Sequence, residues 1–263
     1  MGSYELPHFP GPTLEALSAL RDESSSLERI AETLSVDPSL SVRILSLVNS
    51  AGFGLRTAVD DLPHAVHLVG RSPLESLLIS VSVRQVLPRK ATGVEPRAFW
   101  KSASCRASAA RRLAELLCPS ESHRSFTAGL LQEMAVPLLA ERRGGDYAAV
   151  LDCWRDGGPE LHDLERESFG WNHAEVGLLM CQVWELPERL AVAIGGHHDA
   201  PSADPDVPDP VLLSAFLRES DFQPGVDALI DAVHQRHGVD RERVIEIVDA
   251  SFEDAEGLSD LLG

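Results

Sequence analysis

The sequence predicts an all-α fold, and two kinds of observation support this prediction. Throughout the 263 residues, hydrophobic side chains recur every three or four positions, as on one face of an amphipathic helix, and no segment alternates convincingly every two residues as a strand would. A capping residue followed by proline, a common helix start, occurs at 37–38 and again at 72–73. Hydrophobic residues make up 44% of the chain, so we expect the helices to bury a substantial core.

Residues 5–90 are predicted to form an N-terminal subdomain of five short helices. Serines at 24–26 offer a cap for the second helix, Asp37-Pro38 starts the third, and Ser72-Pro73 starts the fifth. The third helix is expected to end in the segment 49–54, where we interpret Asn49 and Ser50 as capping and turn residues, not as a ligand site. The apolar stripes of the five helices are Leu14/Leu17/Leu20, Leu27/Ile30/Leu34, Ile44/Leu47/Val48, Leu62/Ala65/Val69 and Leu74/Leu77/Val81.

After a linker at 88–96, residues 95–205 are predicted to form a second, HD-like helical subdomain, named for the family resemblance given below. Its first helix, 97–117, is rich in alanine, which favours close approach to a neighbouring helix. Asn172 is expected to cap a later helix, and Pro187 to open another. Residues 206–263 are predicted to form a C-terminal helical extension packed on the same domain. The other expected helices lie around 126–139, 147–154, 161–169, 211–217, 226–233 and 244–262.

The composition narrows the partners and surroundings of this chain. Lysine and arginine number 23 against 41 aspartates and glutamates, and the resulting net charge of −18 disfavours nucleic acid and anionic membranes as partners. No segment approaches the ~20 apolar residues that span a bilayer, and residues 1–12 lack a signal-peptide pattern. The four cysteines have no CxxC spacing and are expected to be buried thiols in a reducing compartment. We therefore expect a cytoplasmic protein, and the sequence leaves open whether it is a monomer or a homodimer.

Several motifs, in order along the chain, carry a resemblance to a known family. The stretch 37–51 is similar to the pattern "DPxLxxxLLxLxNSA", and 65–70 to "AIxxLG". Further on, 171–177 fits "HxxVG", 184–187 fits "WxLP", and Gly196-His197-His198 fits a terminal histidine pair. Together these motifs resemble HDOD domains, the HD-related output domains of bacterial signalling proteins, over nearly the whole chain, most weakly in the last ~55 residues.

The resemblance implies a helical bundle related to the HD phosphohydrolases but generally non-catalytic. In metal-dependent relatives, an early histidine, a His-Asp dyad, later histidines and a distal aspartate converge on the metal. Here the early histidine position falls near Ser102, the dyad position holds Gln132-Glu133, and the distal aspartate position lies in 213–216, which contains no carboxylate. Glutamine offers only a neutral amide oxygen, which binds transition metals poorly. The resemblance leaves His173 and the histidine pair in place.

We therefore predict a non-catalytic bacterial signal-transduction or scaffolding protein, a pseudoenzyme with no cofactor and no bound metal, which acts through an unidentified protein partner. Two alternatives stay open. The first is a residual metal-dependent phosphohydrolase with His173, His197, His198 and Glu133 as ligands. The second is a sensor of a small molecule such as a cyclic dinucleotide, bound in the space of the lost metal, although the charge of −18 disfavours anionic ligands. No GxSxG nucleophile elbow and no glycine-rich phosphate loop occur in the sequence.

Overall fold

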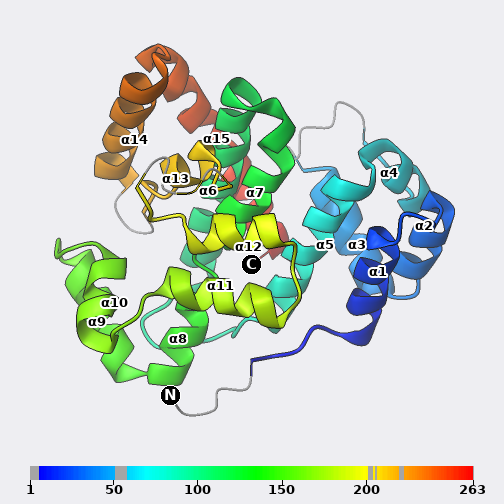
Figure 1. Ribbon diagram of the computed structural model, residues 1–263, viewed down its shortest axis with the longest axis horizontal. Coiled ribbons are helices and arrows are strands. Elements are labelled where there is room, and N and C mark those ends of the chain that lie inside the picture. Colours follow the sequence, from blue (N-terminus) through cyan, green and yellow to red (C-terminus); the bar gives the residue numbers. More distant parts are fainter. Residues whose placement is uncertain (1–5, 51–57, 201–203, 205, 219–221, 263) are drawn as a thin grey trace.

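The computed structural model describes residues 6–50, 58–200, 204, 206–218 and 222–262. Within these ranges the chain consists of α-helices, one short 3₁₀ helix, loops, and a single isolated β-bridge between Ala91 and Val94. The predicted all-α fold is confirmed. Figure 1 shows the helices nearest the N-terminus gathered on one side of the molecule and the later helices on the other.

The N-terminal group consists of α1 (Gly11–Arg21), α2 (Leu27–Ser35), α3 (Pro38–Val48), α4 (Leu62–Val69) and α5 (Arg71–Val86). The side chains of Ser26, Asp37 and Asp61 cap α2, α3 and α4 by accepting hydrogen bonds from backbone N–H groups of the first turn. Of the segment predicted to end the third helix, residues 51–54 lie outside the described residues.

The start of α5 differs from the prediction. The helix begins at Arg71, so Ser72 and Pro73 lie inside its first turn, and no side chain caps it. Gly70 separates α4 from α5 with a φ of 79°, a conformation that glycine adopts without the strain of a Cβ atom. The glycine therefore ends one helix and starts the next, and the capping role predicted for Ser72 is wrong.

The second half of the chain continues with a long helix, α6 (Pro96–Leu117), which the Glu95 side chain caps. Helix α6 packs closely against α7, since a Cβ atom on Gly129 would lie only 2.8 Å from the carbonyl oxygen of Arg106. The following elements are the 3₁₀ helix η2 (Pro119–Glu121), α7 (Ser122–Leu131), α8 (Ala135–Arg143), α9 (Gly145–Arg155), α10 (Leu161–Phe169), α11 (His173–Val183) and α12 (Glu188–Gly195).

The single helix predicted over 126–139 is wrong. Helix α7 ends at Leu131, α8 begins at Ala135, and residues 132–134 form a turn between them. Pro137 explains the break, because a proline has no N–H to donate to the carbonyl four residues earlier and its ring clashes with that carbonyl, here the one of Glu133. The turn gives Gln132 and Glu133 different surroundings.

The C-terminal residues form α13 (Asp209–Ser214), α14 (Phe222–His237) and α15 (Arg241–Leu262), which lie beside α6 and α7 (Figure 1). They share a second hydrophobic core with one face of α6, where Cys105 and Leu113 pack with Leu229, Val233 and Val248. Other residues of α6, such as Ala103 and Ala107, belong to the main core. Helix α6 is thus buried on two sides, and the C-terminal helices are packed onto the second half of the chain.

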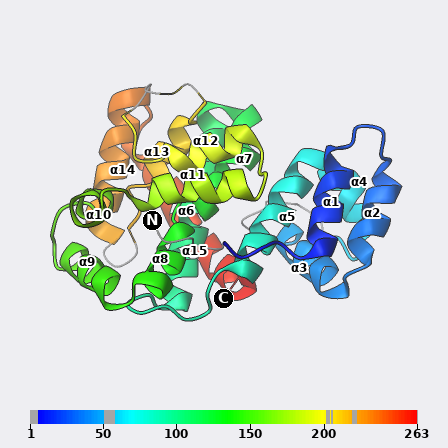
Figure 2. The ribbon, with the colours of Figure 1, turned by 60° about the horizontal axis from the view of Figure 1, so that its bottom comes forward.

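Figure 2 shows the two groups of helices side by side, where α5 packs against α7, and the loop after α11 adds side-chain contacts between them. The indole Nε1 of Trp184 donates to the carbonyl of Pro7 at 2.8 Å, and the Trp184 ring stacks on Phe9 with centroids 4.8 Å apart. Arg21 of α1 donates to the carbonyl of Glu185 at 2.8 Å. Glu185 has a φ of 52°, the only positive value among the described non-glycine residues. The end of α11 is therefore fastened to the N-terminal group.

The cysteines differ in part from their predicted burial. Cys105 and Cys181 are buried, and this burial raises the pKa of each thiol to about 12. Cys118 is half-buried and Cys153 is exposed on α9, so not all four are core thiols. No disulfide joins them within the described residues. None of the described helices is both long enough and apolar enough to cross a membrane.

Candidate functional site

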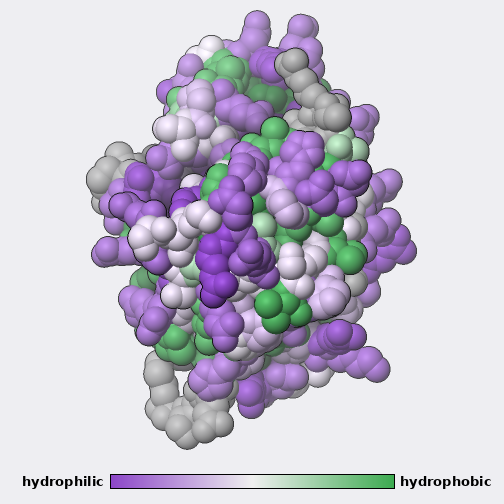
Figure 3. All heavy atoms as spheres, turned by 90° about the vertical axis from the view of Figure 1, so that its right-hand side faces the viewer, coloured by the Kyte–Doolittle hydropathy of each residue, from purple (hydrophilic) through white to green (hydrophobic). Residues whose placement is uncertain are grey.

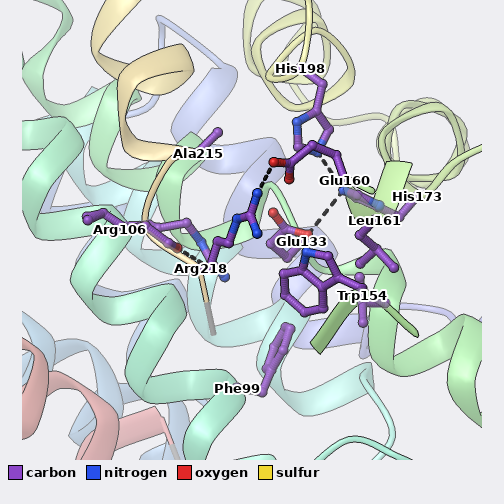
Figure 4. Close-up of a pocket in the computed structure, with 12 residues that line it drawn as sticks. Phe99, Arg106, Glu133, Trp154, Glu160, Leu161, His173, His198, Ala215 and Arg218 are labelled. Carbon is purple, nitrogen blue, oxygen red and sulfur yellow. Dashed lines mark hydrogen bonds and ion pairs between the residues drawn. The ribbon is translucent and has the colours of Figure 1, made fainter. Parts of the chain in front are cut away.

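Four side chains from three separate segments converge near one point. Glu133, His173, His197 and His198 each place a nitrogen or oxygen atom within 4.8 Å of the others, and Figure 4 shows three of them together. His173 lies at the centre: its Nε2 is 3.1 Å from Glu133 Oε2, 2.9 Å from His198 Nε2 and 3.3 Å from His197 Nε2. The structure therefore brings together the four residues that the sequence offered as an alternative metal-ligand set.

Local structure explains why these side chains meet. His173 is the first residue of α11, where the Asn172 side chain accepts a hydrogen bond from Glu175 N at 2.9 Å and caps the helix. The histidine pair directly follows α12 and Gly196. A Cβ atom on Gly196 would lie 2.7 Å from Val207 Cγ2, so the close packing of Val207 against the chain just before the histidine pair requires glycine. Glu133 comes from the turn between α7 and α8.

Gln132, the other member of the dyad position, does not join the cluster. It is fully buried, and its Oε1 accepts a 3.3 Å hydrogen bond from the Ser214 hydroxyl of α13. Its amide nitrogen has no hydrogen-bond partner among the described residues. The two neighbouring residues thus have different environments: Gln132 contacts the C-terminal helices, whereas Glu133 contacts the histidines.

A buried acid that the motif comparison did not identify holds His173 in place. Glu165 of α10 is fully buried, and its Oε2 accepts hydrogen bonds from both His173 Nδ1 at 2.6 Å and His173 N at 2.7 Å. The Tyr147 hydroxyl donates to the other oxygen of Glu165. His197 is oriented in the same way by donating from Nδ1 to the carbonyl of Ile194 at 2.6 Å. Such outer partners fix the ring orientation and leave Nε2 directed at the centre.

The protonation states follow from burial and from neighbouring charges. Burial alone would raise the pKa of Glu133, but the charge of His173 and a hydrogen bond from His197 outweigh it and hold that pKa well below its usual value. Burial would lower the pKa of His173, but Glu133 and then Glu165 raise it. Burial, followed by the charge of His197, lowers the pKa of His198 well below its usual value. The surroundings therefore favour the ionised form of Glu133, the protonated form of His173 and the neutral form of His198.

The donor set fits a divalent transition metal. His197 and His198 direct their Nε2 atoms at the centre, and Glu133 adds a carboxylate oxygen. In a tetrahedral zinc site with Zn–N bonds of about 2.05 Å, two nitrogens lie about 3.3 Å apart, close to the separations seen here. Glu133, His173, His197 and His198 would hold such an ion. A bound ion would supply Lewis acidity at this point.

A small cavity lies beside the cluster, with a volume of about 40 Å³. From α6, Arg106 lines it, whereas Ser102, the expected early-histidine position, is not among the described lining residues. Ala215 of the expected distal-aspartate stretch also lines it and offers no carboxylate. Glu160 and Arg218 also line it, and Figure 4 shows the ion pair between them. Of the positions compared with metal ligands, Glu133 and the three histidines bring ligand atoms together here, and Arg106 lines the cavity beside them.

Asn49 has a structural role. Its side-chain amide donates to the carbonyl of Val59 and accepts from Val59 N, both at 2.7 Å. The pair of hydrogen bonds joins the end of α3 to the residues before α4. This agrees with the interpretation of Asn49 as a turn residue.

Comparisons with known proteins place this geometry in context. The model of the HDOD domain family matches residues 6–200. An uncharacterized protein of Treponema pallidum is 28% identical over 213 residues, which cover 81% of this chain and 41% of the relative. The chain thus spans less than half the length of this curated relative.

Solved structures agree with the fold. An HDOD domain protein of unknown function from Geobacter sulfurreducens has a TM-score of 0.75 at 21% identity, covering 99% of this chain and 94% of the other. A Shewanella amazonensis protein, named only provisionally as a phosphohydrolase, has a TM-score of 0.74 at 25% identity, covering 98% of this chain and 95% of the other. The helical arrangement is therefore shared over nearly the whole of each chain.

Proposed function

Because the chain belongs to the HDOD domain family, we propose that it acts in bacterial signal transduction by binding a protein partner, and not by hydrolysing a phosphoester. The size of the space beside the histidine cluster carries this proposal. At about 40 Å³ it is far smaller than the 300–1,000 Å³ typical of ligand pockets, and it has room for little more than water or an ion. Arg218 and Glu160, which form an ion pair, occupy part of the lining of this space.

The chemistry of the cluster supports the same proposal. Phosphoester hydrolysis in this superfamily uses a metal held by several carboxylates and imidazoles, and here Glu133 is the only carboxylate of the set. The side chain of Arg106 lines the same cavity, and its positive charge further lowers the pKa of Glu133. We propose that the cluster's first role is to join α8, α11 and the end of α12 through buried hydrogen bonds. We also propose a cytoplasmic location and no nucleic-acid partner, the latter because the net charge of −18 repels phosphate backbones.

A hydrolysis assay tests the proposal. The full chain would be stripped of metal, reloaded separately with Mn²⁺, Fe²⁺, Zn²⁺ or Mg²⁺, and incubated with p-nitrophenyl phosphate, bis-p-nitrophenyl phosphate and cyclic dinucleotides. We expect no product above a metal-only blank. A thermal-shift series with the same nucleotides is expected to show no stabilisation. Turnover that disappears in Glu133→Gln would overturn the proposal.

A second function, a residual metal-dependent phosphohydrolase, is favoured by the convergence of three imidazoles and one carboxylate, and by the name of the Shewanella relative. Its first requirement is stoichiometric metal. Metal content would be measured by mass spectrometry of the purified chain and of His198→Gln, which removes a ligand and keeps a polar side chain. Metal that binds the wild type and is lost from the variant, together with hydrolysis, would support this function. Bound metal without hydrolysis would support a structural metal in the first proposal.

A further inference from the structure

A groove between α1 and α2 is a much larger hollow than the cavity at the histidine cluster. Its volume is about 610 Å³, compared with about 40 Å³ beside His173. Both walls belong to helices of the N-terminal group, on the side of the molecule opposite α9 and α10 (Figure 1). The residues that line it are Glu15, Ser18, Ala19, Asp22, Ser25, Arg29, Glu32, Thr33 and Val36. This volume is suited to the side chains of a partner segment.

The groove is acidic on both walls. Glu15 and Asp22 stand on the α1 side and Glu32 on the α2 side. Arg29 is the cation among the described lining residues, and it forms an exposed 3.6 Å pair with Glu32, so the acids of the groove outnumber its cation. Glu15 forms no ion pair with any residue that the structure describes. On the other side of α2, a second hollow adds Glu28 and shares Glu32 and Val36.

The remaining lining residues allow a close approach. Between the carboxylates, the groove presents the short side chains of Ser18, Ala19 and Thr33. At the end of α2, Val36 is 71% exposed and offers an apolar contact beside the carboxylates. Figure 3 looks onto this side of the molecule, where hydrophobic residues are scattered among hydrophilic ones. Helix α1 has 11 residues and is about 16 Å long, which matches three turns of a helix laid beside it.

We propose that this groove binds a basic amphipathic helix of a partner protein. Lysine or arginine side chains along the two edges of that helix pair with Glu15, Asp22 and Glu32, and an apolar side chain contacts Val36. This is the helix-in-groove mode of recognition, with charge complementarity selecting the partner. The inference rests on the proposed protein-binding function and assigns a surface and a partner chemistry to it.

The test uses the full chain and a synthetic helix of about 18 residues, built from alanine, leucine and lysine with lysines on both edges of a leucine stripe. Binding would be measured by fluorescence anisotropy, and the contact surface by chemical-shift changes in ¹H–¹⁵N spectra. The groove variant is Glu15→Lys/Glu32→Lys. Its matched control is Asp249→Lys/Glu253→Lys, which makes the same change of net charge on exposed positions of α15. Circular dichroism would establish that both variants are folded.

We expect shift changes concentrated in α1 and α2, and binding weakened about tenfold or more by the groove variant and about twofold by the control at low salt. Val36→Ser, which removes the exposed apolar contact, is expected to weaken binding without changing its salt dependence. Equal weakening by both double variants would show diffuse attraction and overturn the inference, as would shift changes centred on another element. Shift changes centred on another element would refute this groove but leave the proposed protein-binding function standing. Hydrolysis in the earlier assay would overturn the proposed function and leave the groove mapping unaffected.

Discussion

Replacing Glu165 with glutamine tests whether the buried hydrogen bonds around His173 stabilise the fold. Glu165 is fully buried and accepts hydrogen bonds from His173 N, from His173 Nδ1 and from the Tyr147 hydroxyl. Glutamine has nearly the same shape and can still accept two bonds with its oxygen, so the variant changes the charge more than the packing. The experiment therefore isolates the electrostatic part of the interaction.

The expected loss of stability can be worked out from these three bonds. A hydrogen bond to an ionised group contributes about 1.5–3 kcal/mol and a neutral one about 1 kcal/mol, so each bond weakens by roughly 1 kcal/mol. The sum for Glu165→Gln is about 3 kcal/mol, at the low end of the loss found when one partner of a buried ion pair is removed. With a urea m-value of about 3 kcal/mol/M, the unfolding midpoint should fall by about 1 M.

The loss should also depend on pH, because the pKa of His173 is raised in the folded protein above its unfolded value of 6.5. A raised folded pKa stabilises the protein fully below pH 6.5 and no longer does so once the pH exceeds the folded pKa. Glu165 is one of the two acids that raise this pKa. Glu165→Gln should therefore cost more near pH 6 than near pH 9.

Urea denaturation followed by circular dichroism at both pH values checks this expectation. The matched control is Glu175→Gln, which removes an acid close in sequence whose 3.0 Å pair with Arg166 is half-exposed and should contribute under about 1 kcal/mol. A loss below about 1 kcal/mol for Glu165→Gln, or one that does not change with pH, would refute the reasoning that an ionic hydrogen bond to His173 stabilises the fold.

Two further substitutions test the packing of the fold. Gly129→Ala should destabilise the protein by about 1–3 kcal/mol, because the new Cβ would lie 2.8 Å from the Arg106 carbonyl oxygen. The control Gly257→Ala, with no atom within 4 Å of the new Cβ, should be neutral or slightly stabilising. Thermal unfolding of both variants measures the difference, and equal melting temperatures would contradict the close contact. Asn49→Ala should cost about 2 kcal/mol through the loss of both hydrogen bonds to Val59, and a denaturation midpoint equal to that of the wild type would show that these bonds contribute nothing.

The helices follow from local features of the sequence, and the errors arise where a single residue overrides the pattern. The spacing of apolar residues and the caps at Ser26, Asp37 and Asn172 correspond to observed helices. The hydrophobic pattern continues through 126–139, but Pro137 breaks the hydrogen-bond ladder there, a signal that was present in the sequence. At α5, Gly70 overrode the Ser72-Pro73 signal.

The site was predictable only in part. The resemblance to the family's motifs identified the four residues that converge. Glu165 could not be identified in this way, because it lies in the interior of α10 among other charged residues and nothing in its spacing distinguishes a buried acid from an exposed one. Arg106 likewise has the pattern of a solvated helix face, yet the C-terminal helices bury it, and its side chain donates to the carbonyl of Leu217 at 3.0 Å. Contacts between distant segments decide such cases.

Helix α11 connects the two parts of this molecule mechanically. Its first residue, His173, belongs to the buried cluster. Trp184, just past its last turn, contacts the N-terminal segment by a hydrogen bond to Pro7 and by stacking on Phe9. The 11 residues of α11 span about 16 Å between these two contacts. The helix thus links the histidine cluster to the N-terminal segment, and a substitution at either end of α11 should be judged by its effect on the contacts at both ends.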